Sequence, residues 1–197
     1  IIGREFEFKL LSNLIEDITE DRVLEAVEEA LASRIIEEPS GTIDRYQFSH
    51  ALIQQTLAEE VSTSRRVRLH ARIAEGLEKL YGDDAEAHSA ELAHHFAEAQ
   101  TSTGPDKMVR YSLLAGEQAL AAYAWDEALT HFESGLVARD ITLSGTKAAS
   151  DEQAADLLFG LARAQAATAE VHQLVEAFAA LTRAFEYYAE AGNLAQA

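Results

Sequence analysis

Apolar residues recur at spacings of three and four along most of the chain, which is the period of an amphipathic helix. Up to residue 82 this pattern predicts helices over 8–15, 19–31, 49–61 and 62–82, with Thr19 and Ser49 as capping hydroxyls. The inward-facing residues that we expect are Phe8, Leu11, Leu14, Ile15, Val23, Leu24, Val27, Leu31, Leu52, Ile53, Leu57, Val61, Val67, Leu69, Ile73, Leu77 and Leu80.

Between the second and third of these helices the period changes from helical to extended. The runs 34–38 and 45–48 are short and rich in β-prone residues, and the turn-prone segment Pro39-Ser40-Gly41-Thr42 separates them. They therefore predict a two-stranded hairpin. An isolated hairpin is only marginally stable in water, so it must pack on the preceding helices. Helices followed by a hairpin and then by further helices is the order of a winged helix.

From residue 83 onward the apolar positions combine many alanines with a few large aromatics. Two helical stripes are expected here, the second after Pro105, and they consist of Leu92, Ala93, Phe96 and Ala99, then Met108, Tyr111, Ala115, Ala119 and Ala122. Small residues allow neighbouring helices to approach closely, and aromatics fill the gaps between them. This combination is typical of antiparallel helical hairpins that stack into a solenoid.

Composition supports a division of the chain near Gly82. There are 7 alanines in residues 1–82 and 30 in residues 83–197. We therefore predict a mainly α protein with two modules: a winged-helix domain with a small β-hairpin and a trailing long helix over 1–82, and helical repeats over 83–197.

Charge and cysteine content exclude several classes of protein. The chain carries 16 basic and 34 acidic residues, a net charge of −18, and has no cysteine. Such a field repels nucleic-acid phosphates and anionic lipid, so direct nucleic-acid binding is disfavoured and no membrane partner is expected. The sequence lacks a disulfide framework, a long apolar run and the order of a signal peptide, so we expect a cytoplasmic location.

The one dense basic cluster lies at the start of the long helix and consists of Arg65, Arg66, Arg68 and Arg72. It is either a contact patch for phosphate or an acidic partner, or a solvated helix face paired with nearby acids. On a later helix, His88, Glu91, His95 and Glu98 have a spacing that could hold a metal, but a solvated face is the favoured interpretation. The sequence shows no glycine-rich phosphate loop or nucleophile elbow, so we predict no catalytic residues and no metal or other cofactor within these 197 residues.

Residues 115–135 resemble a tetratricopeptide repeat. Ala115 and Gly116 match the small pair of its first helix, and Ala128, Phe132 and Gly135 match the small, large, small order of its second. Trp125 is expected to fill a gap between helices, while Ser112 replaces a frequent aromatic.

A looser second copy follows the polar linker 141–151. It consists of Leu161 and Ala162, then Ala177, Leu181 and Ala184, and the spacing between its two halves is 3 residues longer than in the first copy. The helices of the second copy should therefore be longer. Residues 191–193 suggest a helix stop followed by a new start, so the array is expected to be cut within a repeat.

Three segments together resemble the winged-helix region of bacterial STAND-class ATPases, which include large LuxR-type regulators and ATPase-coupled nucleotide cyclases. The segments are 3–6, 46–53 (Tyr-Gln-Phe-Ser-His-Ala-Leu-Ile) and 62–70, which contains Arg-Arg-Val-Arg-Leu-His. In that class this region follows a nucleotide-binding domain and precedes helical repeats. The resemblance implies that His50 reaches the phosphates of bound ADP and holds an inactive arrangement. It also implies ATP or ADP and magnesium in the parent protein.

Two functions follow from these expectations. The first is a non-catalytic regulatory and interaction segment, in which the winged helix senses the nucleotide state of an upstream domain and the repeats bind a protein or effector. The alternative is a DNA-binding transcription regulator that uses the arginine cluster. The winged-helix half has a net charge of −6, and Glu25, Glu28 and Glu29 lie on its second helix, which favours the first function.

Overall fold

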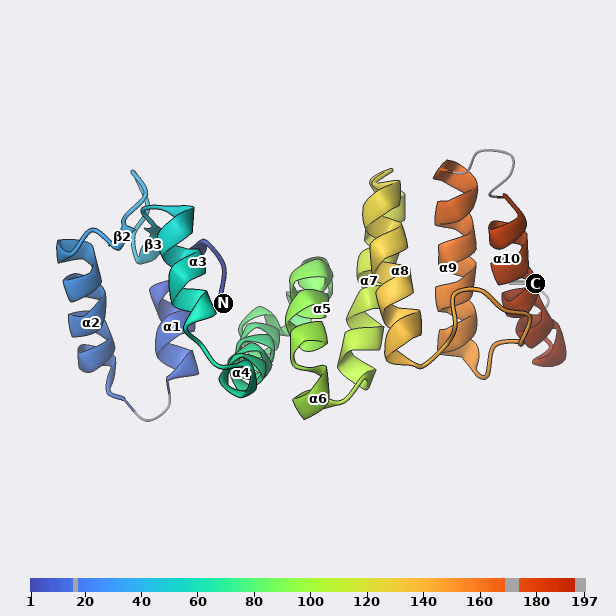
Figure 1. Ribbon diagram of the computed structural model, residues 1–197, viewed down its shortest axis with the longest axis horizontal. Coiled ribbons are helices and arrows are strands. Elements are labelled where there is room, and N and C mark those ends of the chain that lie inside the picture. The colour runs from blue at the N-terminus through green and yellow to red at the C-terminus, as the bar shows by residue number, and fades with distance from the viewer. Residues whose placement is uncertain (16–17, 169–173, 194–197) are drawn as a thin grey trace. The chain divides into compact units, whose positions relative to one another are not determined.

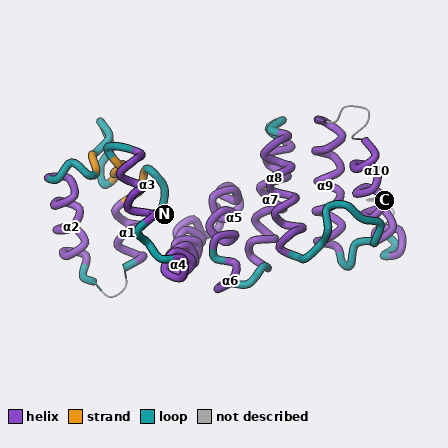
Figure 2. Tube along the Cα trace, in the orientation of Figure 1, coloured by secondary structure: helices purple, strands orange, loops and turns teal. Residues whose placement is uncertain are grey.

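A computed structural model describes residues 1–15, 18–168 and 174–193 of the chain (Figures 1 and 2). The protein is mainly α, with one small antiparallel sheet near its N-terminus. The contacts divide it into two compact units, Ile1–Ala85 and Glu86–Ala197. The boundary that we predicted after Gly82 lies three residues earlier, and the assignment of each unit to a domain type stays a prediction.

The first unit contains three strands and four helices among its described residues. In chain order they are β1 (Glu5–Glu7), α1 (Phe8–Leu14), α2 (Glu20–Ala32), β2 (Ile36–Glu37), β3 (Arg45–Phe48), α3 (Ala51–Glu59) and α4 (Thr63–Tyr81). A 3-10 helix follows over Gly82–His88.

The sheet has the strand order β1-β3-β2, and both pairings are antiparallel. The predicted hairpin is confirmed, since Ile36 pairs with Phe48. Strand β1 was not predicted, because three residues are too few to show an alternating pattern; its Phe6 lies opposite Tyr46. The buried cluster under this sheet consists of Val27 from α2, Ile36 and Tyr46, so the hairpin is packed against a preceding helix as expected.

Several local expectations for this unit are wrong. Helix α2 begins directly after Thr19, but the Thr19 hydroxyl does not cap the helix. Ser49 does not cap α3 either; the N-cap residue is His50, and the Ser49 hydroxyl donates to the carbonyl oxygens of Arg34 and Ile35.

Three leucines that we expected to face inward are instead largely exposed. Leu24 is 42% exposed, Leu52 71% and Leu57 45%. Helix α3 contacts β3 within the first unit and has no fully buried residue, so its apolar positions are only partly covered. Periodicity predicted the helix correctly but not how much of it the fold would cover.

The long helix α4 packs against α1. Ile73 and Leu77 are each 2% exposed, as predicted for the core of this helix. The two helices approach closely at Gly76, where a Cβ atom would lie 3.0 Å from Cδ2 of Leu14. Helix α4 therefore completes the first unit rather than serving as a free connector.

The second unit consists of helices joined as antiparallel hairpins. They are α5 (Ser89–Glu98), the short α6 (Gln100–Thr103), α7 (Asp106–Ala121), α8 (Trp125–Ala138), α9 (Glu152–Thr168) and α10 (Leu174–Glu190). Apart from α6, each helix packs on the next one along the chain, and Figure 1 shows α7, α8, α9 and α10 side by side.

The pattern of burial in this unit follows the predicted stripes. Leu92, Phe96 and Tyr111 are at most 1% exposed, and the Phe96 and Tyr111 rings stack with centroids 5.7 Å apart. Ala122 is exposed, against expectation, because α7 ends one residue earlier. Helices α9 and α10 have 17 residues each, against 16 and 14 in α7 and α8, which confirms that the second pair is longer.

The predicted helix stop after residue 190 is confirmed by the end of α10 and by Gly192, whose φ is 74°. The predicted new start lies outside the described residues. Over the described ranges, no helix combines the length and apolar content that crossing a membrane requires.

Candidate functional site

The phenyl ring of Phe132 on α8 occupies the space between two glycines of neighbouring helices. A Cβ atom on Gly116 of α7 would lie 2.5 Å from Cε1 of this ring, and one on Gly160 of α9 would lie 2.4 Å from it. Phe132 is fully buried. The ring therefore sits where the two flanking helices present bare backbone, so three helices come together around one side chain. Sequence analysis identified Phe132 and Gly116 but missed Gly160.

Most of the other residues predicted to pack between the repeats are buried. A Cβ atom on Gly135 would lie 2.8 Å from Cδ2 of Leu157 on α9, so α8 and α9 also approach closely there. The buried members of the predicted set are Ala115, Gly116, Ala128, Phe132, Gly135, Ala162, Ala177 and Ala184.

Two members of this set differ from expectation. Trp125 is only half-buried, at the start of α8, where it meets Tyr123 edge to face. Leu181 is 39% exposed. It lies on α10 with Val175, Phe178 and Phe185, which are 72%, 65% and 49% exposed. This apolar face of α10 is turned away from the neighbouring helix α9.

The linker 141–151 is anchored by a buried arginine of α10. The Arg183 side chain is 4% exposed, and it donates from Nε to the carbonyl of Lys147 at 2.6 Å and from Nη1 to that of Thr142 at 2.9 Å. Burial lowers the pKa of Arg183. The Tyr188 hydroxyl donates to Asp156 on α9, and burial together with this carboxylate raises the pKa of Tyr188 well above its usual value. These polar contacts fix the linker and the last helical pair.

His50 lies at the edge of a polar cavity in the first unit. The residue is exposed and precedes α3. The cavity has a volume of about 480 Å³ and is lined by Leu31, Arg34, Ile36, Glu37, Glu38, Ser49 and His50. The imidazole is thus accessible to a ligand and lies in a cavity that contains one arginine. The predicted role of His50 in nucleotide sensing stays a prediction.

The predicted basic cluster is divided by the structure. Arg66 is half-buried, and its Nη2 donates to the carbonyl of Ala58 near the end of α3 at 3.2 Å. Arg65, Arg68 and Arg72 are exposed, but only Arg65 and Arg72 line a cavity. Arg66 therefore has different surroundings from the other three arginines, and the predicted contact role of the cluster stays a prediction.

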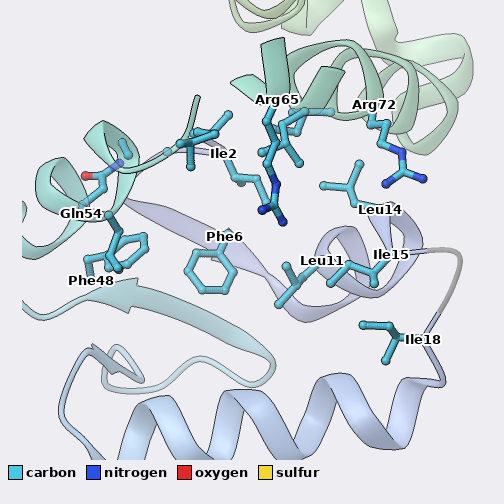
Figure 3. Close-up of a pocket in the computed structure, with 17 residues that line it drawn as sticks. Ile2, Phe6, Leu11, Leu14, Ile15, Ile18, Phe48, Gln54, Arg65 and Arg72 are labelled. Carbon is cyan, nitrogen blue, oxygen red and sulfur yellow. The ribbon is translucent and has the colours of Figure 1, made fainter. Parts of the chain in front are cut away.

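That cavity was not predicted from the sequence. It has a volume of about 500 Å³, lies within the first unit, and is bounded by residues from the N-terminal segment, α1, α3 and α4, together with Phe6 and Phe48 of the sheet. Figure 3 shows the Arg65 side chain extending from α4 toward Phe6 and Leu11, with Arg72 next to Leu14. No local pattern in the sequence indicates this cavity, because residues as far apart as Ile18 and Leu57 come to line it only in the folded chain.

The residues considered for metal binding do not form a site together. His95 is buried, whereas Glu91 and Glu98 are exposed on the same helix. Within the described part of the chain, these residues and His88 do not bring three ligand atoms together. The interpretation as a wholly solvated face is wrong for His95, which is only 3% exposed.

Comparisons with protein-family models, with curated proteins and with solved structures found no match to this chain. The class that its fold defines is therefore the coarse one given above: a mainly α protein of packed helical hairpins with a small three-stranded sheet.

Proposed function

We propose that this chain is a non-catalytic regulatory and protein-interaction segment of a multidomain STAND-type signalling ATPase. In this proposal the first unit is a winged helix that responds to the nucleotide state of an upstream domain. The second unit is a tetratricopeptide-like array that binds a protein or effector. The parent protein would hold ATP or ADP with magnesium and act in the cytoplasm.

The topology of the first unit supports the winged-helix part of the proposal. Two helices, α1 and α2, separate β1 from the β2–β3 hairpin in the chain. Strand β3 nevertheless pairs with β1 in the sheet. An isolated two-stranded hairpin is only marginally stable, whereas a third paired strand stabilises it. The three-stranded sheet can therefore act as a rigid element. Such an element can move as a body when the nucleotide state changes.

The packing of the second unit supports the repeat part. Helices α7 and α8 form one hairpin and α9 and α10 the next, and Phe132 lies between Gly116 and Gly160. Stacked hairpins offer extended surfaces for partners. The apolar face of α10, which includes Phe178 and Phe185, is a surface of this kind.

The observation that carries the proposal is the presence, in one chain, of this three-stranded sheet and the stacked helical hairpins in the order that the resemblance implies. His50 lines an accessible cavity that also contains Arg34 and the two carboxylates of Glu37 and Glu38, and an imidazole can donate a hydrogen bond to a phosphate oxygen. This placement is compatible with nucleotide sensing.

The alternative, a DNA-binding transcription regulator, is disfavoured by charge. The exposed residues of α2 include Glu20, Asp21, Glu25, Glu28 and Glu29 but only one cation, Arg22. An acidic helix does not approach phosphates favourably. A salt-dependent mobility shift of generic duplex DNA at micromolar protein would favour the alternative and contradict our proposal.

The experiment uses the longest natural chain that contains this sequence. Our proposal requires a Gly-x-x-x-x-Gly-Lys-Ser/Thr loop N-terminal to Ile1, within two domain lengths or about 300 residues. In that protein, His50→Ala should accelerate ADP release by about tenfold or more, since hydrogen bonds to charged groups contribute roughly 1.5–3 kcal/mol. Release is measured by chromatography of retained nucleotide after rapid desalting.

Gln55→Ala is the matched control, because Gln55 is an exposed residue of α3, the helix that His50 precedes, and its side chain hydrogen-bonds only Glu59 among the described residues. It should leave ADP release unchanged. Equal release rates for the wild type and His50→Ala would contradict the role assigned to His50, and absence of the phosphate loop would contradict the whole proposal.

A further inference from the structure

We propose that the apolar cavity of the first unit is a binding site for a single-chain amphipathic anion, such as a medium-chain carboxylate. The hydrocarbon chain would lie along the cavity walls, and the anionic head would bind Arg65 and Arg72. This site is distinct from the polar cavity at His50 and does not depend on the proposed regulatory function.

The walls of the cavity are suited to a hydrocarbon chain. Its 17 lining residues contribute only three polar side chains, those of Gln54, Arg65 and Arg72. Two of the apolar lining residues are about half exposed: Ile18 is 50% exposed and Leu57 is 45% exposed. Removing such apolar surface from water is favourable, so an apolar ligand that covers it would gain affinity.

The volume of the cavity suits a small molecule. About 500 Å³ lies within the range of roughly 300–1,000 Å³ that small-molecule sites occupy. Such sites combine mainly apolar walls with a few polar groups that fix the orientation of the ligand. This cavity has that composition, with both of its charged side chains on one helix.

The sign of the head group follows from the two arginines. Arg65 and Arg72 are seven residues apart on α4, so they lie on the same face of the helix, roughly 10 Å apart along its axis. Both side chains are exposed, and the structure gives neither guanidinium a hydrogen bond or ion pair with any of the residues that it describes. Two guanidinium groups at an apolar cavity favour an anionic head group over a cationic one, and guanidinium binds carboxylate with two parallel hydrogen bonds.

The two other arginines of α4 set the limits of the site. Arg66 is held by the carbonyl of Ala58 and does not line the cavity. Arg68 is exposed on α4 between Arg65 and Arg72 in sequence, yet it is not a lining residue. Arg68 is therefore a matched control for the charge of this helix.

The test is isothermal titration calorimetry of the full chain with octanoate, decanoate and dodecanoate, each below its micelle concentration. If the hydrocarbon chain is buried, each added methylene should tighten binding by about fourfold. Decyltrimethylammonium, with a similar chain and the opposite charge, should bind far more weakly than decanoate. Equal affinity across the carboxylate series, or tighter binding of the cation, would overturn the proposal.

Variants separate the head-group contacts from the chain contacts. Arg65→Gln with Arg72→Gln should weaken decanoate binding by about tenfold or more, because charge-assisted hydrogen bonds are lost. Arg68→Gln removes a charge from the same helix and should leave the affinity unchanged. If Arg68→Gln weakens binding as much as the double variant, the effect is general electrostatics and the proposal fails.

Ala58→Trp places a large ring at the cavity wall and should abolish binding. Circular dichroism checks the fold of this variant. If it does not fold, the substitutions of the exposed Arg65 and Arg72 still test the proposal. A vesicle assay distinguishes the source of the anion: cosedimentation with phosphatidylglycerol vesicles in the absence of decanoate binding would identify a membrane surface instead. Binding of an acidic amphipathic peptide without decanoate binding would likewise overturn the proposal.

Discussion

At the scale of single residues, the second unit depends on the size match between Phe132 and the two glycines beside it. Sequence spacing pointed to Phe132 and Gly116, because they fit the small and large positions of a repeat pattern. Gly160 is 28 residues beyond Phe132 in the chain, and an isolated glycine in a helical pattern does not show which side chain packs against it. Only the packing of α9 on α8 shows that this position must lack a side chain.

Replacing Gly160 with alanine should destabilise the protein by about 1–3 kcal/mol. The new Cβ would lie 2.4 Å from the Phe132 ring, which is fully buried and cannot move aside, and overpacking costs of this order are typical. Urea unfolding followed by circular dichroism measures the loss. The double variant Gly160→Ala with Phe132→Leu should recover part of it through a favourable coupling energy.

Gly76→Ala on α4 is the control. Its new Cβ would lie 3.0 Å from the end of the half-buried Leu14 side chain and at an ordinary 3.9 Å from Cδ1 of Leu10, and alanine gains about 1 kcal/mol of helix propensity over glycine. It should therefore be much less destabilising. If both glycine variants lose the same free energy, the argument from ring contact is wrong.

At the scale of elements, the positions of helix starts were easier to predict than the groups that cap them. Thr19 immediately precedes α2, but its hydroxyl does not bond to the helix end. Asp151, by contrast, does cap a helix. Its Oδ1 accepts a hydrogen bond from the backbone N–H of Ala154 at 3.0 Å, at the start of α9. Burial alone would raise the pKa of Asp151, but this hydrogen bond, the Ser150 hydroxyl and the charge of Arg139 lower it.

Asp151→Ala should destabilise the protein by about 1 kcal/mol at neutral pH, through the loss of the helix cap. Because the pKa of Asp151 is lowered on folding, its ionised form stabilises the folded state above the ordinary value of 3.8. This contribution disappears as the pH falls through the lowered pKa. Thermal unfolding at neutral and at strongly acidic pH should therefore show a difference from wild type that shrinks in acid.

Asp151→Asn keeps an acceptor for the cap and removes only the charge that pairs with Arg139. At neutral pH, Asp151→Asn should lower the free energy of unfolding by less than Asp151→Ala does, since the lost carboxylate charge is partly exposed and screened. A difference between Asp151→Ala and wild type that is independent of pH would contradict this explanation.

At the scale of the whole molecule, each of the two compact units has its own buried core. The core of the first unit includes Val27, Ile36 and Tyr46 around a small sheet. The second unit has a larger set of fully buried residues, among them Leu157, Leu158 and Phe132. Because a core mutation acts on the residues that pack around it, it should change the stability of its own unit first.

Val27→Ala should lower the stability of the first unit by about 1–3 kcal/mol. Circular dichroism reports on both units, whereas Trp125 is the one tryptophan of the sequence and lies in α8 of the second unit. In urea, the variant should therefore shift part of the dichroism transition to lower concentration and leave the tryptophan fluorescence transition in place.

Leu157→Ala provides the reverse control, since Leu157 is fully buried in α9. It should shift the tryptophan fluorescence transition. If Val27→Ala shifts both transitions equally, the two units unfold as one cooperative body. The prediction that a core mutation first affects its own unit is then wrong.

The sequence by itself determined the features that depend on near neighbours in the chain. Helical periodicity predicted the mainly α class and the buried stripes of α5 and α7, and β-prone runs around a turn predicted the β2–β3 hairpin. These patterns are local, so the residues that create them are close together in the sequence. The change in alanine content also predicted the division near Gly82, close to the boundary at Ala85.

The tertiary structure alone decided the features that join distant segments. Strand β1 forms because Phe6 pairs with Tyr46, which lies forty residues later in the chain. Leu52 is exposed because the rest of the first unit covers only part of α3. The cavity beside Arg65 and Arg72 is formed where the N-terminal segment, α1, α3 and α4 meet. A pattern of apolar residues shows that a helix has a face to bury, but which partner covers that face depends on long-range packing.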